Sequence, residues 1–284
     1  MGITKKQKKF FYKMFQYCLL IMLGSIIIYP LIWLFFATFK SNSEIFGSAK
    51  ILPEKFSFSP YIEGFKGNGQ FHFGLFFVNT FKLVIPTIAF TVISSILSGY
   101  SFARFSFPFK RLLFYIMLAT LILPNAVVII PRFILFNKFR WVNSYLPFYI
   151  PALLACQSFF IYMAIQFLRG LPVELDESAK IDGCNSFMIL WRILLPLSKS
   201  LVFSIVLFQF IWTWNDFFNP LIYINSVKKY PVSLALKMSL DINETTQWSN
   251  VLSMALLSML PCIILFFAAQ KYFVEGIAAS GLKG

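Results

Sequence analysis

Acidic residues gather in one short segment of the chain. Four of the eleven Asp and Glu residues lie between positions 174 and 182, namely Glu174, Asp176, Glu177 and Asp182. Clustered carboxylates serve acid–base catalysis or pair with basic groups on another protein. The single histidine, His72, and four widely separated cysteines give no spacing typical of a hydrolase or a zinc site. The pattern does not favour an enzyme, and we predict no cofactor and no metal.

The rest of the composition is typical of a protein that crosses a membrane several times. The mean hydropathy is +0.74, with 19% aromatic and 13% charged residues, which lies far outside the range of soluble domains. A net charge of +14 is compatible with nucleic-acid binding, but the lysines are scattered among apolar runs and no basic face alternates with aromatic side chains. We therefore predict a chain that contacts membrane lipid and binds no nucleic acid.

Several apolar runs reach the length of about 20 residues that a membrane-spanning helix requires. They cover residues 17–39, 76–103, 112–136, 146–168, 201–224 and 251–269. Since no internal repeat is visible, we predict an all-α membrane protein with six spans in a single domain, residues 1–284. The basic run K-K-Q-K-K near the N-terminus and the short basic connection after the second span favour cytoplasmic termini and a cytoplasmic loop at 169–200.

Small residues recur every four positions in the second predicted span. They are Thr91, Ser95, Gly99 and Ala103. This spacing would let another helix approach closely. The alternative is a pore-lining row of hydroxyl groups that also includes Ser94 and Ser98.

Prolines and isolated basic residues mark the second and third spans. Pro124 and Pro131 predict kinks in the third span. Lys82 and Arg132 either extend to the outer membrane interface or line a basic path for an anionic solute.

The acidic segment has the pattern of a short helix followed by a turn. Pro172 suits the start of a helix, and the acids after it favour the positive end of the helix dipole. Lys180 suits the last turn, and Gly183 suits a left-handed position just beyond it.

A second short helix is predicted after the turn. Asn185 or Ser186 can cap it, and Pro196 would end it before the fifth span. We expect its face to be lined by Phe187, Trp191 and Leu194. Physical reasoning alone leaves two roles open for this helix pair, namely a solvated connection or a surface that docks onto another protein.

Residue identities in this segment resemble the EAA motif of the membrane subunits of bacterial ABC importers. That motif reads E-A-A, three residues, G, nine residues, then I-x-L-P; here Glu177-Ser178-Ala179, Gly183 and I-L-L-P at 193–196 fall at the same spacing. Ser178 and Cys184 depart from the usual alanines. W-T-W-N-D-F-F-N-P-L at 212–221 and the ending G-I-A-A-S-G-L-K-G also resemble carbohydrate-importer permeases, in particular the smaller permease of maltose-type systems.

The resemblance implies a type I permease subunit of an ATP-driven carbohydrate importer in the bacterial cytoplasmic membrane. It implies several partners: a second homologous permease, two cytoplasmic ATP-binding subunits, an extracytoplasmic solute-binding protein and a sugar substrate. ATP hydrolysis would belong to the ATP-binding subunits, because this chain has no G-x-x-x-x-G-K-[ST] phosphate loop.

The resemblance also implies which residues couple the chain to the ATPase. They are Glu177, Ser178, Ala179, Asp182, Gly183, Ile193, Leu195 and Pro196. The small residues suit close approach of a partner, and Glu177 suits pairing with a basic group. Glu174 and Asp176, in contrast, are explained by the helix dipole alone.

Polar and aromatic residues share one side of the fifth predicted span. Gln209, Thr213 and Asp216 recur at spacings of four and three. The arc is completed by Trp212, Asn215 and Asn219. Sugar hydroxyls need hydrogen bonds and sugar rings need flat apolar partners, so this arc either lines a sugar path or holds the helix to a partner permease near the aromatic belt.

Three alternative functions stay open. An ABC permease could carry another small solute, such as a sugar phosphate or a sugar acid. A transporter driven by an ion gradient would have ion-binding acids near the middle of the membrane and an internal repeat, and Asp216 is the only candidate acid. A membrane-embedded enzyme would cluster His, Asp or Cys at one membrane face.

Overall fold

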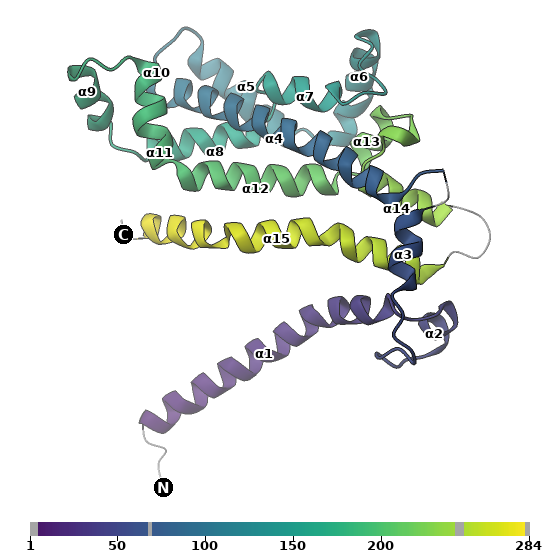
Figure 1. Ribbon diagram of the computed structural model, residues 1–284. Helices are drawn as coiled ribbons and strands as arrows, with labels where there is room; N and C mark the ends of the chain where they lie inside the picture. Colours follow the sequence, from purple (N-terminus) through teal and green to yellow (C-terminus); the bar gives the residue numbers. More distant parts are fainter. Residues whose placement is uncertain (1–4, 68–69, 242–246, 282–284) are drawn as a thin grey trace. The chain divides into compact units, whose positions relative to one another are not determined.

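The computed structural model describes residues 5–67, 70–241 and 247–281, and these form helices and turns without a β-strand (Figure 1). The predicted all-α class is therefore confirmed. The chain divides into two compact units. Unit 1 contains Met1–Phe73 and Met238–Ser258, and unit 2 contains Gly74–Lys237 and Met259–Gly284. The single domain stays a prediction. The resemblance of the ending G-I-A-A-S-G-L-K-G also stays a prediction, and its last residues, 282–284, lie outside the described residues.

The helices differ widely in length. Unit 1 holds α1 (Lys5–Ala37), α2 (Asn42–Gly47), α3 (Ser59–Lys66) and the first part of α15 (Trp248–Gly281). Unit 2 holds nearly all of α4 (Phe73–Arg104), most of α14 (Val232–Asp241) and the remainder of α15. Between α4 and α14 it contains α5 (Lys110–Ile122), α6 (Asn125–Lys138), α7 (Leu146–Leu153), α8 (Ser158–Arg169), α9 (Glu174–Ile181), α10 (Ser186–Ile189), the π-helical turn η1 (Leu190–Leu194), α11 (Leu195–Leu197), α12 (Lys199–Asn215), α13 (Phe218–Tyr223) and the 3₁₀ turn η2 (Val227–Lys229).

Four helical stretches are long and apolar enough to cross a membrane. They are Lys9–Ala37, Phe73–Arg104, Leu146–Arg169 and Trp248–Gln270. Two bent helix pairs raise the number to six if each pair is one span: α5 with α6, and Ser186–Leu197 with α12. Each predicted span overlaps one of these stretches or pairs, although Leu146–Arg169 is itself made of α7 and α8 and the second pair covers 186–215 where the sequence predicted 201–224.

The third predicted span is sharply bent. α5 and α6 meet at 108°, which is a turn of the chain and not the kink that Pro124 predicted. The cause is Leu123, which is extended at ψ 118°, because the ring of a following proline disfavours the helical conformation in the residue before it. The chain therefore bends at Pro124 as predicted, but the bend divides 112–136 between two helices instead of kinking one.

Unit 1 is organised around the end of α1. The Phe39 ring is buried and packs edge-on against Phe58 at 5.4 Å between centroids. The Thr38 hydroxyl lies 2.9 Å from the hydroxyl of Tyr61 on α3. A capping box at Ser41 starts α2, and hydrogen bonds donated by the backbone N–H groups of Ser41 and Glu54 lower the pKa of Glu44 below its usual value.

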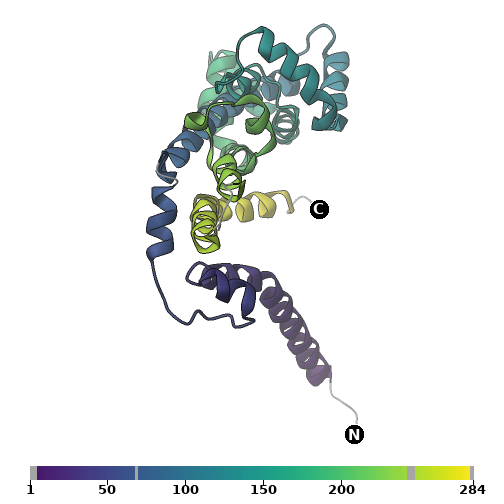
Figure 2. The same ribbon diagram turned by 90° about the vertical axis from the view of Figure 1, so that its right-hand side faces the viewer.

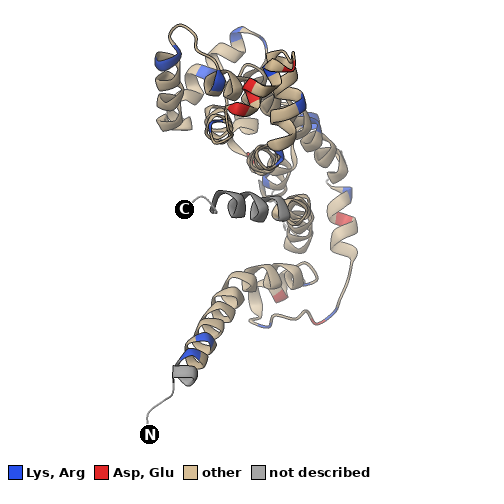
Figure 3. Cartoon of the chain, turned by 90° about the vertical axis from the view of Figure 1, so that its left-hand side faces the viewer, with Lys and Arg blue, Asp and Glu red and all other residues tan. Residues whose placement is uncertain are grey.

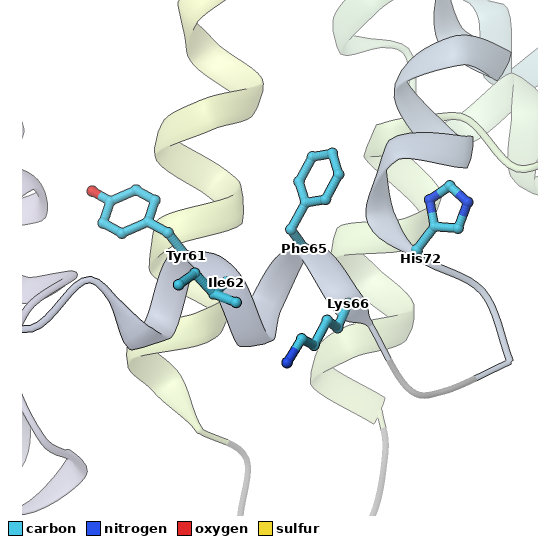
Figure 4. A pocket seen from close by; sticks show the side chains of 5 residues that line it. All are labelled: Tyr61, Ile62, Phe65, Lys66 and His72. Carbon is cyan, nitrogen blue, oxygen red and sulfur yellow. The ribbon is translucent and has the colours of Figure 1, made fainter.

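A shallow pocket of about 470 Å³ lies along α3 (Figure 4). It is lined by Tyr61, Ile62, Phe65, Lys66 and His72. His72 is exposed in the turn before α4, as expected for a solvated loop histidine. Among the described residues, no group of three or more His, Cys, Asp or Glu side chains is placed to hold a metal ion.

Helices α4, α8 and α12 pack together in unit 2 (Figures 1 and 2). Their core includes Ile96 of α4, Phe160 of α8 and Ile205 of α12. Side chains of α9, α10 and η1 join the same core, so the short helices after α8 are packed onto the long ones.

The small-residue stripe on α4 allows the close approach that its spacing predicted. Thr91, Ser95 and Gly99 are buried. A Cβ added to Gly99 would lie 2.5 Å from the Cβ of Ala164 and 3.1 Å from the carbonyl carbon of that residue. Ser94 donates a 2.6 Å hydrogen bond to the carbonyl of Ala152, which gives this hydroxyl a packing role.

The first turns of α4 hold a distant connecting segment. The side-chain amide of Asn79 donates to the carbonyls of Lys228 and Tyr230, at 2.8 and 3.1 Å. The hydroxyl of Thr80 accepts the backbone N–H of Val232 at 2.9 Å. Polar side chains near one end of α4 thus satisfy backbone groups of the segment that follows α13.

Candidate functional site

The acidic segment forms α9, and its acids lie where the sequence placed them. Glu174, Asp176 and Glu177 occupy the first turn, and Lys180 occupies the last. Figure 3 shows the acidic residues of the described chain in red and the basic residues in blue. Acids at this end and a base at the other complement the helix dipole. The helix begins at Glu174 with Val173 as its N-cap, so Pro172 lies just before the helix and not inside its first turn.

The turn after α9 has the predicted left-handed glycine. Gly183 has φ +80°, and its N–H donates to the carbonyl of Lys180 at 3.0 Å. The N–H of Cys184 donates to the carbonyl of Ala179 at 2.9 Å. This pair of bonds is the Schellman arrangement, which closes a helix and satisfies its last carbonyls.

We expect replacing Gly183 with alanine to lower the free energy of unfolding by about 1–2 kcal/mol, because a Cβ disfavours the left-handed conformation. Steric crowding is not the cause of this loss of stability, since no atom outside the neighbouring residues lies within 4 Å of a Cβ added to Gly183. Thermal unfolding of the purified protein in detergent measures the change. Gly183→Asn is the matched control and should lose less, because asparagine tolerates this conformation. Equal stability of the alanine variant and the wild type would contradict the prediction.

The second short helix has the predicted N-cap but not the predicted face. Asn185 accepts the backbone N–H of Met188 at 2.8 Å. Phe187 and Trp191 are exposed and stack with their rings 7° apart in orientation, whereas Leu194 is fully buried. The reason is the π-helical turn η1, whose wider turn rotates Leu194 away from the other two side chains.

The proposed coupling residues fall into two groups. One group is exposed: Glu177, Ser178, Asp182, Gly183 and Pro196. The other packs inward: Ala179 is 4% exposed, and Ile193 and Leu195 are partly buried against the same core. Ala179 therefore differs from the expectation of a small contact residue for a partner, because its small side chain lets α9 approach this chain's own helices.

Sequence reasoning missed Arg104 and Asp176 as a pair. Arg104 ends α4, and its Nε lies 2.9 Å from Oδ2 of Asp176, with side chains 8% and 6% exposed. A helix-dipole argument had accounted for Asp176 fully, so its burial was not expected. The available signal was a basic residue at the end of one apolar run and an acid cluster on the same predicted side of the membrane.

The polar arc predicted on the fifth span is interrupted. Helix α12 ends at Asn215, and Asp216 is extended at ψ 114°, so Asn219 belongs to the separate helix α13. A continuous helix over 201–224 was therefore wrong. Gln209 and Thr213 are buried and joined by a 2.7 Å hydrogen bond.

Pro220 explains why α12 stops. A helix continued through Pro220 would leave the carbonyl of Asp216 without its usual N–H partner, because proline has none. That carbonyl instead accepts the hydroxyl of Ser233 at 2.8 Å. The Asp216 carboxylate accepts the backbone N–H of Asn219 at 3.1 Å and its side-chain amide at 2.8 Å, a local pattern that competes with a helix.

The two other arc residues face outward from α12. Trp212 is 47% exposed, and its ring packs near those of Phe159 and Phe160 on α8, at 5.0 and 5.1 Å between centroids. Asn215 is exposed and donates to the carbonyl of Ile211 at 2.8 Å. The six candidates thus divide into a buried pair, an exposed pair and a pair beyond the helix end.

Comparison with known proteins gives a consistent set of relatives. The family model described as "Binding-protein-dependent transport system inner membrane component" matches residues 92–278. The arabinooligosaccharides transport system permease protein AraQ of Bacillus subtilis is 30% identical over 93% of each chain. The galactooligosaccharides permease GanQ of the same organism is 28% identical over 98% of each chain, and the sn-glycerol-3-phosphate permease UgpE of Yersinia pestis is 28% identical over 94% of this chain and 96% of its own.

A solved structure shares the fold. It is a crystal structure of a bacterial ABC transporter involved in the import of the acidic polysaccharide alginate. The similarity has a TM-score of 0.84 and covers 96% of this chain and 99% of the other, with 21% sequence identity. The all-helical fold is therefore that of a type I ABC importer permease. The chain is thus a multi-pass, non-enzymatic component of the cytoplasmic membrane and belongs to the family of binding-protein-dependent transport system inner membrane components, the permeases of ABC importers.

Proposed function

We propose that this chain is a permease subunit of an ATP-driven importer of sugars or oligosaccharides. The observation that carries the proposal is the α9 segment, which presents Glu177 and Asp182 to solvent while Ala179 packs it onto the core. An exposed acidic helix that is fixed to the long helices suits docking of a second protein whose movement has to reach the spans.

The proposed assembly contains partners on both sides of the membrane. A second homologous permease completes the translocation path, two cytoplasmic ATP-binding subunits hydrolyse ATP, and an extracytoplasmic protein delivers the solute. Both termini of this chain are cytoplasmic in the proposal, which the basic residues at the start of α1 support. Closure of the ATP-binding subunits would rock the spans and open the path alternately to each side.

The proposed docking surface uses the exposed coupling residues. Glu177 pairs with a basic group of the ATP-binding subunit, and Ser178 and Asp182 border it. Gly183 sets the direction of α9, and Pro196 lies between the second short helix and α12. Ala179, Ile193 and Leu195 contribute by holding the segment against the core that it shares with α4, α8 and α12.

The proposed solute is a carbohydrate. The printed names of AraQ and GanQ support this class. An anionic solute such as a sugar phosphate or sugar acid is the second candidate, because UgpE is named for sn-glycerol-3-phosphate and the structural relative for alginate import. Lys82 and Arg132, exposed on α4 and α6, suit an anion as well as they suit an interface position.

The proposed path residues are those of the interrupted arc. Trp212 and Asn215 can offer a flat ring and an amide to a sugar from the exposed side of α12. Gln209 and Thr213 support that side from within, and Asp216 and Asn219 fix the helix end beside it.

Uptake by reconstituted vesicles tests the proposal. The chain is co-purified with the transport proteins of neighbouring genes, and vesicles are supplied with labelled arabinotriose, galactobiose or sn-glycerol 3-phosphate. We expect uptake of at least one solute that requires both ATP and the binding protein. Uptake that persists without ATP and follows an ion gradient would favour a secondary transporter, and hydrolysis of the solute by the isolated chain would favour an enzyme.

A further inference from the structure

A buried ion pair joins the end of α4 to the start of α9. Besides the 2.9 Å contact with Asp176, the Arg104 guanidinium donates from Nη2 to the carbonyl of Leu171 at 2.9 Å and to that of Pro172 at 3.4 Å. These carbonyls belong to the segment that leads into α9. One side chain therefore holds both the helix and the turn before it.

The burial of Asp176 is not required for starting the helix. Glu174 and Glu177 lie in the same turn and are exposed, and they complement the helix dipole without losing contact with water. Placing two charges inside a protein costs hydration energy, and a buried pair gives little net stability over apolar residues of the same size. Its geometry, with one arginine ion-paired to Asp176 and hydrogen-bonded to two carbonyls, is suited to fixing the position of α9.

The neighbouring contacts make this end of α4 a junction. Ala179, one turn after Asp176, packs in the same core as Ile96 and Tyr100 of α4. Ile189 of α10 is fully buried in the same core as Tyr100. The last two turns of α4 thus hold both short helices of the coupling segment.

We propose that Arg104 and Asp176 are a positioning pair that makes α4 move with α9. The pair does not touch the solute or ATP. A force applied to the exposed side of α9 reaches α4 through the guanidinium, since the same group also fixes residues 171 and 172. This inference rests on the proposed function, in which α9 is the element displaced by the ATP-binding subunits.

A double-mutant cycle tests the pair in the complete transporter. The variants are Arg104→Gln, Asp176→Asn and the double variant. Two quantities are measured, namely the yield of complex with the ATP-binding subunits and the amount of solute imported per ATP hydrolysed. The solute is whichever of arabinotriose, galactobiose and sn-glycerol 3-phosphate the wild type imports. Each single variant leaves one buried charge unpaired and should lower the yield. The double variant should recover the yield but import roughly tenfold less solute per ATP, within the range of about 5- to 150-fold that is usual for coupling between sites.

Two further variants sharpen the result. Glu174→Gln removes a charge from the same turn of α9 and should leave both quantities unchanged. Arg104→Lys keeps the charge but cannot bond to Asp176 and two carbonyls at once, so it should assemble normally and still import less solute per ATP. This variant keeps the test decisive even if the double variant does not assemble.

The outcomes separate the two proposals. If the wild type shows ATP-dependent uptake and the double or lysine variant matches its import per ATP, the positioning role is overturned while the proposed function stands. If the wild type imports none of the solutes with ATP, the proposed function fails and the positioning role fails with it. Recovery of yield without recovery of coupling supports the pair as a positioning device.

Discussion

We expect the Glu177→Lys variant to insert into the membrane at the wild-type level and to lose nearly all ATP-dependent uptake. Glu177 is exposed on α9, so the substitution does not place a charge inside the protein. A lysine at this position would place a positive charge against the basic group that the proposed docking requires. Like charges brought together at an interface cost several kcal/mol, which is enough to reduce binding of the ATP-binding subunits by roughly a hundredfold or more.

Two measurements check this result. Co-purification reports whether the ATP-binding subunits remain attached, and vesicle uptake reports whether transport is coupled to ATP. Glu174→Lys is the matched control, because it reverses the same charge in the same helical turn at a second exposed position. Wild-type uptake by the Glu177→Lys transporter would defeat the docking role, and an equal loss in both variants would show that charge alone and not position is responsible.

The largest expected effect on stability comes from Gly99→Val. An added Cβ would contact Ala164 at 2.5 Å and the backbone nitrogen of Ile165 at 3.3 Å. The crowded atoms include backbone atoms of α8, which cannot rotate away as a side chain can, so the whole helix has to move away from α4. We expect the free energy of unfolding to fall by about 3 kcal/mol, the upper end of the usual range for overpacked cores, and thermal unfolding in detergent to occur at a clearly lower temperature.

Matched variants separate crowding from the properties of valine in a helix. Gly24→Val makes the same change in α1, where no atom lies within 4 Å of an added Cβ, and it should alter stability little. Ala164→Gly combined with Gly99→Val removes the 2.5 Å contact but not the backbone contacts, so it should restore part of the loss. A Gly99→Val protein as stable as the wild type would contradict the close approach of these helices.

Local features of the coupling segment were predictable because they follow from short-range chemistry. The acids at the start of α9, the left-handed Gly183 and the cap at Asn185 each depend on backbone groups within a few residues. The Gly99 contact was also predictable, since the four-residue spacing places small side chains on one face of a helix. The EAA spacing then identified the family, which the comparisons confirmed.

Features that depend on distant neighbours or on subtle backbone choices were not predicted. The sharp turn at Leu123 and the end of α12 at Asn215 both precede a proline, but Pro124 predicted only a kink and Pro220 lies five residues beyond the end of α12. The π-helical turn that places Leu194 in the core has no recognisable pattern in the sequence. The inward orientation of Asp176 requires knowledge that Arg104, 72 positions earlier, ends its helix beside it.

Helix α4 bonds to a connecting segment near each of its ends. Asn79 and Thr80 hold residues 228–232, and Arg104 holds residues 171, 172 and 176. The two sets of contacts are about 37 Å apart along the helix, at about 1.5 Å per residue. α4 therefore connects the segment after α13 to the segment that leads into α9. If a ligand bound to one of these segments shifts α4, we expect the affinity of the other segment for its own partner to change as well, because linkage is reciprocal.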